Sequence, residues 1–210
     1  MCGRKGSFVM AQNHAADKQQ TTRECIKKTF LAIYKKKPLQ RIFVSDLVSA
    51  CNISRGTFYF HFENIEQLYR ECEQDLIDKM EDGLNKVVLC TVGGSRKNMT
   101  QFIKTYSDHL SRYPEYGEQF RCLLEGSEQS SFRKHWVESV YNHFQQVLPF
   151  SSTISPVQIQ FLLHFFSGGE VHMLAKWVLG GFVEPAKEIA AVSAQVLFQG
   201  TYVPGNPDSQ

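Results

Sequence analysis

The sequence predicts an all-α protein, and three observations indicate this fold class. Apolar residues recur along most of the chain at the i, i+3, i+4 and i+7 spacing of an amphipathic helix. Helix breakers, Gly and Pro, separate the periodic segments of the second half, and no segment competes as a β-strand. With 42% apolar residues in 210, the chain can bury a core without disulfides or structural metals.

The first expected helix begins at Thr21, which has capping-box spacing to Glu24, and ends at a lysine triplet before Pro38. Residues 1–20 show no sustained period, and we expect them to form a flexible leader. The same expectation holds for residues 201–210, where two prolines prevent a continuing helix.

Two short helices joined by a sharp turn are expected next. Four apolar residues over 44–51 fall on one face of a two-turn helix. Asn52 then suits a left-handed turn residue, and Ser54 can cap a third helix. This spacing matches a helix-turn-helix, whose second helix enters the DNA major groove. An α-hairpin that packs against another part of the protein is the alternative.

The third helix is expected to have an inner and an outer face. At 100° per residue, Phe58 and Phe62 face inward, whereas Gly56, Tyr59 and Phe60 face outward. An outer face that carries a glycine and two aromatic residues is unusual for a solvated helix, and it favours a contact surface.

The charges divide along the chain, although the total is only +2. Residues 1–62 hold 11 Lys and Arg against 3 Asp and Glu, a net charge of +8. Residues 63–210 hold 12 against 18, a net charge of −6. The division suggests a basic module that faces a polyanion and is attached to an acidic body. An ordinary solvated charged surface is the alternative.

The segments Ile42–Leu47, Asn52–Phe62 and Asn64–Leu68 resemble the TetR family of bacterial transcription regulators. The run Ser54-Arg-Gly-Thr-Phe-Tyr-Phe-His-Phe62 carries most of this resemblance, which covers residues 20–68. Residues 161–196 resemble the ligand-domain ending of a branch common in Firmicutes, a weaker match. The resemblance implies an N-terminal three-helix helix-turn-helix DNA-binding domain and a C-terminal helical ligand-binding and dimerisation domain.

The resemblance also implies which residues contact double-stranded DNA. The positions that approach base edges are Ser45, Arg55, Gly56 and Tyr59, those near phosphates are Thr57, Phe60 and His61, and the helix cap Ser54 completes the set. Arg55 could bond a guanine through two hydrogen bonds. Gly56 could let the backbone approach the DNA closely.

Three positions depart from the family's pattern. Glu63 and Ile65 stand where members often carry Lys, and the loss of two cations should lower DNA affinity and its salt dependence. Phe43 stands where a capping Thr is usual, so another group must cap the helix over 44–51. Asn64, three residues before Gln67, can still cap the fourth helix.

The second half is expected to be helical throughout. A long helix runs from Asn64 toward residues 87–89, and the chain breaks at the glycines that follow. Further helices are expected over 97–112, 115–125, 130–148, 156–180 and 185–199. The predicted organisation is a leader over 1–20, a DNA-binding domain over 21–67, a ligand-binding and dimerisation domain over 68–200, and a tail over 201–210.

The aromatic residues of the second half are expected to form core, because aromatic stripes at helical spacing usually pack together. The family resemblance implies that some of them line an apolar pocket. The candidates are Phe102, Tyr106, Phe120, Trp136, Tyr141, Phe144 and Phe165. It also implies that the last two helices form a homodimer, so that two DNA-binding domains contact a palindrome.

The leading hypothesis is a homodimeric, sequence-specific DNA-binding regulator, a repressor that responds to a small apolar or aromatic effector. The alternative is a coactivator or adaptor of the same fold that acts through protein contacts. We expect no enzyme activity, because catalytic motifs are absent, and no cofactor or metal site. The cysteines form no C-x-x-C pair and no apolar run is long enough for a membrane span, so a cytoplasmic protein is expected.

Overall fold

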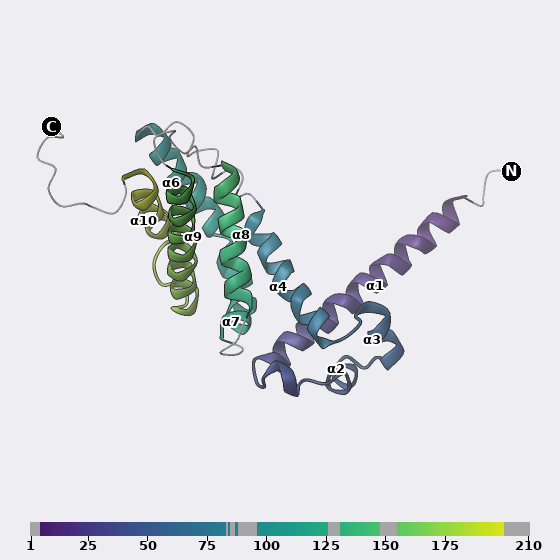
Figure 1. Cartoon of the computed structure of the whole chain (residues 1–210). Helices are drawn as coiled ribbons and strands as arrows, with labels where there is room; N and C mark the ends of the chain where they lie inside the picture. Colours follow the sequence, from purple (N-terminus) through teal and green to yellow (C-terminus); the bar gives the residue numbers. More distant parts are fainter. Residues whose placement is uncertain are drawn as a thin grey trace, which may run out of the picture. The chain divides into compact units, whose positions relative to one another are not determined.

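The computed structural model describes residues 5–82, 84, 87, 96–125, 131–147 and 155–199, with the backbone alone for 5–19, 96–98, 147 and 199. Every regular element in these ranges is helical (Figure 1). The predicted all-α fold class is confirmed. None of the helices in these ranges is long and apolar enough to cross a membrane.

The chain divides into two compact units. The N-terminal unit comprises Met1–Gln74 with Glu125–Glu128, and the C-terminal unit comprises Asp75–Leu124 with Gln129–Gln210. The division falls inside helix α4 (Ile65–Glu81), between residues 74 and 75, and the boundary expected from the sequence, between residues 67 and 68, also falls inside this helix. Because one helix continues across the boundary, the sequence has no Gly- or Pro-rich stretch there that would mark a linker.

The N-terminal unit contains α1 (Lys5–Tyr34), the 3₁₀ turn η1 (Leu39–Arg41), α2 (Val44–Cys51), α3 (Arg55–His61) and the first part of α4. Its core is formed by apolar faces of all four α-helices. Phe30 and Tyr34 stack on each other with ring centroids 5.6 Å apart, and Tyr69 of α4 packs against both rings. Three buried aromatic side chains thus join α1 to α4.

The expected start of the first helix at Thr21 is wrong. Helix α1 begins at Lys5, so most of the expected leader is helical, and residues 1–4 lie outside the described ranges. Residues 5–20 contain no proline and several good helix formers, so nothing ends the helix before Thr21. Glu24 does not serve a cap, because its carboxylate accepts a hydrogen bond from Gln20 Nε2 at 3.2 Å.

The C-terminal unit contains the five helices that the sequence predicts, each within two residues of its expected bounds at either end. They are α6 (Arg96–Leu110), α7 (Gly117–Glu125), α8 (Phe132–Val147), α9 (Pro156–Leu179) and α10 (Ala186–Gln199), with the 3₁₀ turn η2 (Tyr113–Tyr116) before α7. Helix α8 packs along α9, and α10 packs along α6 (Figure 1).

Local signals fix the ends of α9. Ser155 accepts a hydrogen bond from the backbone of Gln158 at 3.2 Å, and the Gln158 side chain accepts one from the Ser155 amide at 2.9 Å. At the other end, Gly181 has a positive φ of 84°, which only glycine adopts without strain. The expected tail over 201–210 and residues 88–95, where the chain was expected to break, lie outside the described residues.

Candidate nucleic-acid interface and small-molecule pocket

The turn between α2 and α3 has the geometry that the sequence predicts. Asn52 lies in the left-handed region, with φ 51° and ψ 48°. The next amide, that of Ile53, donates to the carbonyl of Val48 at 3.0 Å, which closes the end of α2. The chain can therefore reverse within three residues and begin α3 at Arg55.

Asp46 provides the missing cap of α2. Its carboxylate accepts a hydrogen bond from the Phe43 amide at 2.9 Å and one from Lys37 Nζ at 2.6 Å. The hydrogen bond from Lys37 is the main cause that lowers the pKa of Asp46, followed by the bond from the Phe43 backbone. The helix therefore begins properly although Phe43 has no capping oxygen.

Helix α3 presents the two faces that its spacing predicts. Phe58 and Phe62 are buried, whereas Tyr59 and Phe60 are 57% and 68% exposed. At the start of the helix, the Thr57 amide donates to Ser54 Oγ at 3.0 Å, which confirms the expected cap. Two large aromatic side chains on a seven-residue helix thus remain in solvent.

The other residues predicted to contact DNA lie on α2, on α3 and at the cap before α3. Ser45 of α2, the cap Ser54, and Arg55 and Gly56 of α3 are exposed, and Thr57 is half-buried. A Cβ added at Gly56 would meet only Ser54 Oγ, at 3.6 Å, which is an ordinary contact distance. No packing contact among the described residues requires a glycine there.

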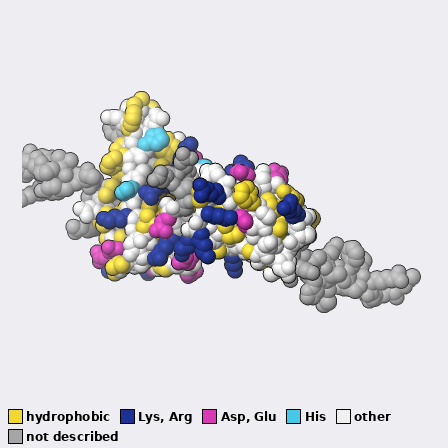
Figure 2. Space-filling view, turned by 90° about the horizontal axis from the view of Figure 1, so that it is seen from below, with side chains coloured by type: hydrophobic (Ala, Val, Ile, Leu, Met, Phe, Trp, Pro, Cys, Tyr) yellow, Lys and Arg dark blue, Asp and Glu magenta, His cyan; other side chains and the backbone are white. Residues whose placement is uncertain are grey.

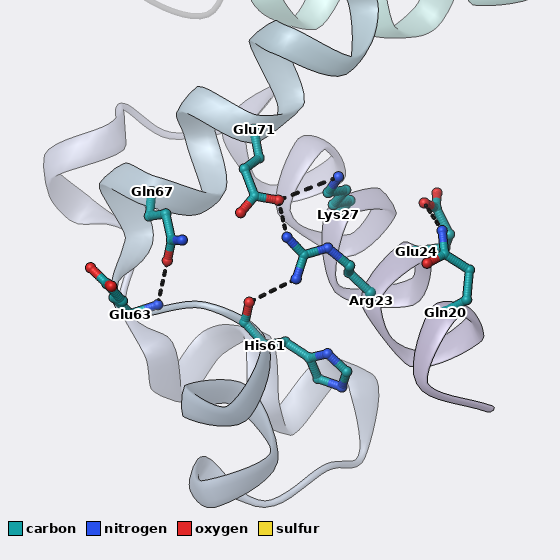
Figure 3. A network of polar contacts seen from close by, with 8 residues as sticks. All are labelled: Gln20, Arg23, Glu24, Lys27, His61, Glu63, Gln67 and Glu71. Carbon is teal, nitrogen blue, oxygen red and sulfur yellow. Dashed lines mark hydrogen bonds and ion pairs between the residues drawn. The ribbon is translucent and has the colours of Figure 1, made fainter. Parts of the chain in front are cut away.

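Arg23 of α1 holds the C-terminal end of α3 (Figure 3). Its Nη1 donates to the carbonyl oxygen of His61 at 2.8 Å, and its other nitrogen is ion-paired with Glu71 of α4. The guanidinium also lies over the Phe62 ring, 4.5 Å from the centroid. Lys27 Nζ is 3.6 Å from the same Glu71 carboxylate. This group, the Arg23 network, ties three helices together.

His61 is half-buried beside this network. Burial lowers the pKa of its imidazole, and the positive charge of Arg23 lowers it further. Both effects favour the neutral form of the ring, which can donate a hydrogen bond to a phosphate without adding a charge.

A pocket lies in the C-terminal unit, lined by α4, α6, α8, α9 and α10. The cavity itself has a volume of only about 30 Å³, it is partly open to solvent, and its walls are mainly apolar. Four of the seven residues for which the family resemblance implies a pocket role line it: Phe102, Tyr106, Trp136 and Phe144. A second cavity shares Phe144 with the first and is also lined by Phe165.

Two predicted pocket residues line neither cavity. Phe120 is fully buried, and its ring packs against Tyr113 and Trp136 with centroids 5.2 and 5.5 Å apart. Tyr141 stacks on His164 at 4.6 Å. An aromatic residue at helical spacing can face the core or the cavity, and the sequence does not distinguish the two.

The sequence reasoning missed Glu170 of α9, a polar residue that lines both cavities. Its Oε1 accepts hydrogen bonds from Tyr106 at 2.5 Å and from Ser193 at 2.9 Å. Burial raises the pKa of Glu170, while the two hydroxyl donors act in the opposite direction. The pKa of Tyr106 is raised as well, by burial first and then by the charge of Glu170.

Two family models match the parts of the chain that carry these two sites. Residues 32–72 match a model described as bacterial regulatory proteins, tetR family, and residues 97–199 match one described as a transcriptional regulator C-terminal region. The chain belongs to the TetR family of transcriptional regulators. It is a DNA-binding regulator by fold, and the helix-turn-helix described above lies inside the first match. The second description names no bacterial branch, so the resemblance to a Firmicutes branch stays a prediction.

Solved structures of TetR-like fold cover most of the chain. A TetR-family transcriptional regulator from Bordetella parapertussis 12822 has a TM-score of 0.54 at 15% identity, over 85% of this chain and 94% of that one. A proposed fatty acid metabolism regulator of Clostridium perfringens has a TM-score of 0.51 at 14% identity, over 85% and 99%. At these identities the likeness shows the fold alone. None of the curated proteins compared matches the sequence.

The N-terminal unit carries fewer unpaired positive charges than the net charge of +8 over residues 1–62 suggests. Arg23, Lys27 and Lys37 are each paired with a carboxylate of the N-terminal unit. Figure 2 shows a face of the molecule on which Lys and Arg side chains lie in small groups with hydrophobic side chains between them. The sequence could not reveal these pairs, because Arg23 and Glu71 are 48 positions apart.

The start of α4 shows how the missing lysines are accommodated. Ile65 is 8% exposed and belongs to the core, whereas Glu63 is exposed. Asn64 Oδ1 accepts the Gln67 amide at 2.8 Å, which confirms the expected cap, and Gln67 Oε1 accepts the Glu63 amide at 2.5 Å. Within the described ranges, no group of three or more His, Cys, Asp or Glu is placed to hold a metal ion.

Proposed function

We propose that the protein is a ligand-responsive repressor that binds a palindromic operator as a homodimer. The observation that carries this proposal is the exposed face of α3, where Arg55, Gly56, Tyr59 and Phe60 stand over buried Phe58. Tyr59 and Phe60 keep more than half of their surface in solvent. Such a face suits insertion into the major groove of DNA.

Each exposed residue of this face has a distinct role in the proposed complex. Arg55 binds a guanine through its two hydrogen-bond donors, which discriminates by about 1–3 kcal/mol. Tyr59 and Ser45 contact base edges. Thr57, Phe60 and His61 contact phosphates, which fix the register of the helix without reading sequence. Ser54 keeps the start of α3 in place through its cap.

The proposed dimer forms through α9 and α10. Phe161 and Phe165, one turn apart on α9, are 68% and 61% exposed. Further along the helix, a Cβ added at Gly168 or Gly169 would meet, apart from its sequence neighbours and the nearby backbone of α9, no atom of the described residues within 4 Å. Large apolar side chains beside two glycines on one helix suit close packing against a second copy. Two copies can then contact half-sites about 34–36 Å apart.

The effector is proposed to occupy the pocket between α4, α6, α8, α9 and α10 and to favour a spacing of the two DNA-binding units that does not fit the operator. Such a ligand must bind the released state more tightly. A change from 1:99 to 99:1 in the population of that state requires about 5.5 kcal/mol of differential binding.

A mobility-shift titration across a range of salt concentrations tests the proposal. The probes are DNA fragments from the region that flanks the protein's own gene, and the variants are Arg55→Ala and Tyr59→Ala. Arg133→Ala, which removes an exposed cation from α8, is the matched control. We expect specific binding that both α3 variants weaken and the control does not. If no fragment is bound specifically at low salt, the repressor function is refuted.

One observation favours a second function, that of an adaptor or coactivator. Helix α3 exposes two aromatic side chains, Tyr59 and Phe60, and one cation, Arg55, and the exposed Glu63 just after it adds a negative charge. Such a surface also suits protein contacts. A chain that dimerises but binds no DNA fragment specifically would support this alternative.

A further inference from the structure

The pocket of the C-terminal unit contains a carboxylate that a purely apolar ligand would not require. Glu170 lies where the two cavities meet, and both also share Phe144, Ser193 and Leu197. Removing a carboxylate from water is costly unless another charge or several hydrogen bonds replace the water. The surroundings of Glu170 therefore indicate what the pocket is built to hold.

The hydrogen bonds of Glu170 are unevenly distributed between its two oxygens. Tyr106 and Ser193 both donate to Oε1, at 2.5 and 2.9 Å. Within the described part of the chain, Oε2 has no hydrogen-bond partner. Two hydroxyl groups thus fix the orientation of the carboxylate and leave one oxygen free to accept a bond from a ligand.

The charged residues that line the two cavities also favour a ligand that interacts with a carboxylate. Among the described residues, Glu170 and Glu81 are the charged side chains that line the two cavities, and no Lys, Arg or His does so. Glu81 is exposed and accepts a hydrogen bond from Ser139, whereas Glu170 is half-buried. Two carboxylates without a cation give the pocket a negative potential, which attracts a positively charged ligand.

We propose that the effector is an amphipathic cation, a protonated amine attached to an apolar or aromatic body. The ammonium group donates a hydrogen bond to Oε2 of Glu170, and the body occupies the second cavity, which has a volume of about 220 Å³ and is lined by Phe144 and Phe166. The faces of these rings add a favourable interaction with a nearby positive charge. This inference rests on the proposed ligand-responsive function and specifies the chemical class of the ligand.

A charged hydrogen bond sets the expected selectivity. An alcohol of the same shape can donate one hydrogen bond but leaves the carboxylate without a counter-charge, and a carboxylic acid analogue is repelled. A hydrogen bond to a charged group contributes enough to expect at least about a tenfold preference for the amine over the alcohol.

The test is calorimetric titration of the full-length protein, without DNA, with three probes of one skeleton: phenylbutylamine, phenylbutanol and phenylbutyrate at neutral pH. The variant is Glu170→Gln, which keeps the volume of the side chain and an acceptor for Tyr106 and Ser193. The control is Glu138→Gln, an exposed glutamate on α8 that lines neither cavity.

We expect wild type and control to bind the amine about tenfold or more tightly than the alcohol, and the acid most weakly. Glu170→Gln should bring the amine and the alcohol within about twofold of each other. The proposal is overturned if wild type binds no amine, if the alcohol binds as tightly, or if Glu170→Gln keeps the preference. The wild-type series decides the matter even if the variant does not fold. Because no DNA is present, failure to bind the amine refutes the ligand class but not the proposed DNA binding. Failure to bind DNA in the mobility-shift assay likewise leaves the result of the calorimetric titration unchanged.

Discussion

Gly56→Ala separates the stability of α3 from its ability to bind DNA. Gly56 is the second residue of α3 after the cap Ser54, and an added Cβ would meet only Ser54 Oγ, at 3.6 Å. Alanine loses less conformational entropy than glycine when a helix forms, so the variant should be more stable by about 0.5–1 kcal/mol. No contact with a described residue of the N-terminal unit opposes this gain.

The same methyl group should weaken DNA binding, because it lies on the face that we propose to enter the major groove. If it holds α3 away from the bases, the loss should resemble that of one bidentate contact, about 1–3 kcal/mol, or about 5- to 150-fold in affinity. Fluorescence anisotropy with a labelled operator fragment measures the affinity at fixed salt, and urea unfolding measures the stability. Asn142→Ala on exposed α8 is the matched control, since it should also stabilise a helix but leave DNA affinity unchanged.

Two results would refute this reasoning. Wild-type affinity in Gly56→Ala would show that the backbone of α3 does not approach DNA closely at this residue. A loss of stability would show that the space around Gly56 is not open in solution. The predicted combination, a protein that is more stable but binds DNA less tightly, is not produced by general misfolding.

Three further predictions concern the Arg23 network, pH and dimerisation. Glu71→Gln should lower the free energy of unfolding by about 1–3 kcal/mol in urea titrations, because Arg23 loses its counter-charge, and an unchanged midpoint would contradict this role. Burial lowers the pKa of His109 to about 4, so the unfolded state binds more protons between about pH 6.5 and 4 and stability should fall by about 3 kcal/mol as pH drops through this range. In chemical unfolding at a series of pH values, the free energy of unfolding should depend less steeply on pH in His109→Gln than in wild type. The same pH dependence in both proteins would show that His109 is not responsible. Phe165→Glu should shift the protein to a monomer in analytical ultracentrifugation, and an intact dimer would exclude this face of α9.

The helices of the C-terminal unit could be predicted because their ends are determined locally. Ser155 and Gln158 form their capping box within four residues, and Gly181 reverses the chain at the end of α9. The same holds for Asn52 and Ser54 around the turn of the helix-turn-helix. The start of α1 was predicted wrongly because Thr21 and Glu24, although correctly spaced, can form a capping box only where a helix begins, and here the preceding residues are already helical.

The polar part of the pocket could not be predicted, because it is assembled from separate helices. Tyr106 and Glu170 are 64 positions apart, and Ser193 is 23 positions beyond Glu170. No spacing in the sequence relates a residue on α6 to one on α9. The family resemblance implied several aromatic residues that line the pocket but not the carboxylate between them, which is the feature that specifies a ligand class.

The Arg23 network also affects how salt titrations of this protein should be interpreted. The side chains of Arg23 and Glu71 are 30% and 25% exposed, so the pair is only partly shielded from ions in solution. Added salt therefore has two effects. It competes with the protein for DNA phosphates, and it weakens the Arg23–Glu71 ion pair that links the end of α3 to α4. Part of the decrease in DNA affinity with salt would then come from weakened contacts inside the protein and not from counterions released from DNA. The number of phosphates deduced from that decrease would exceed the number that the protein contacts.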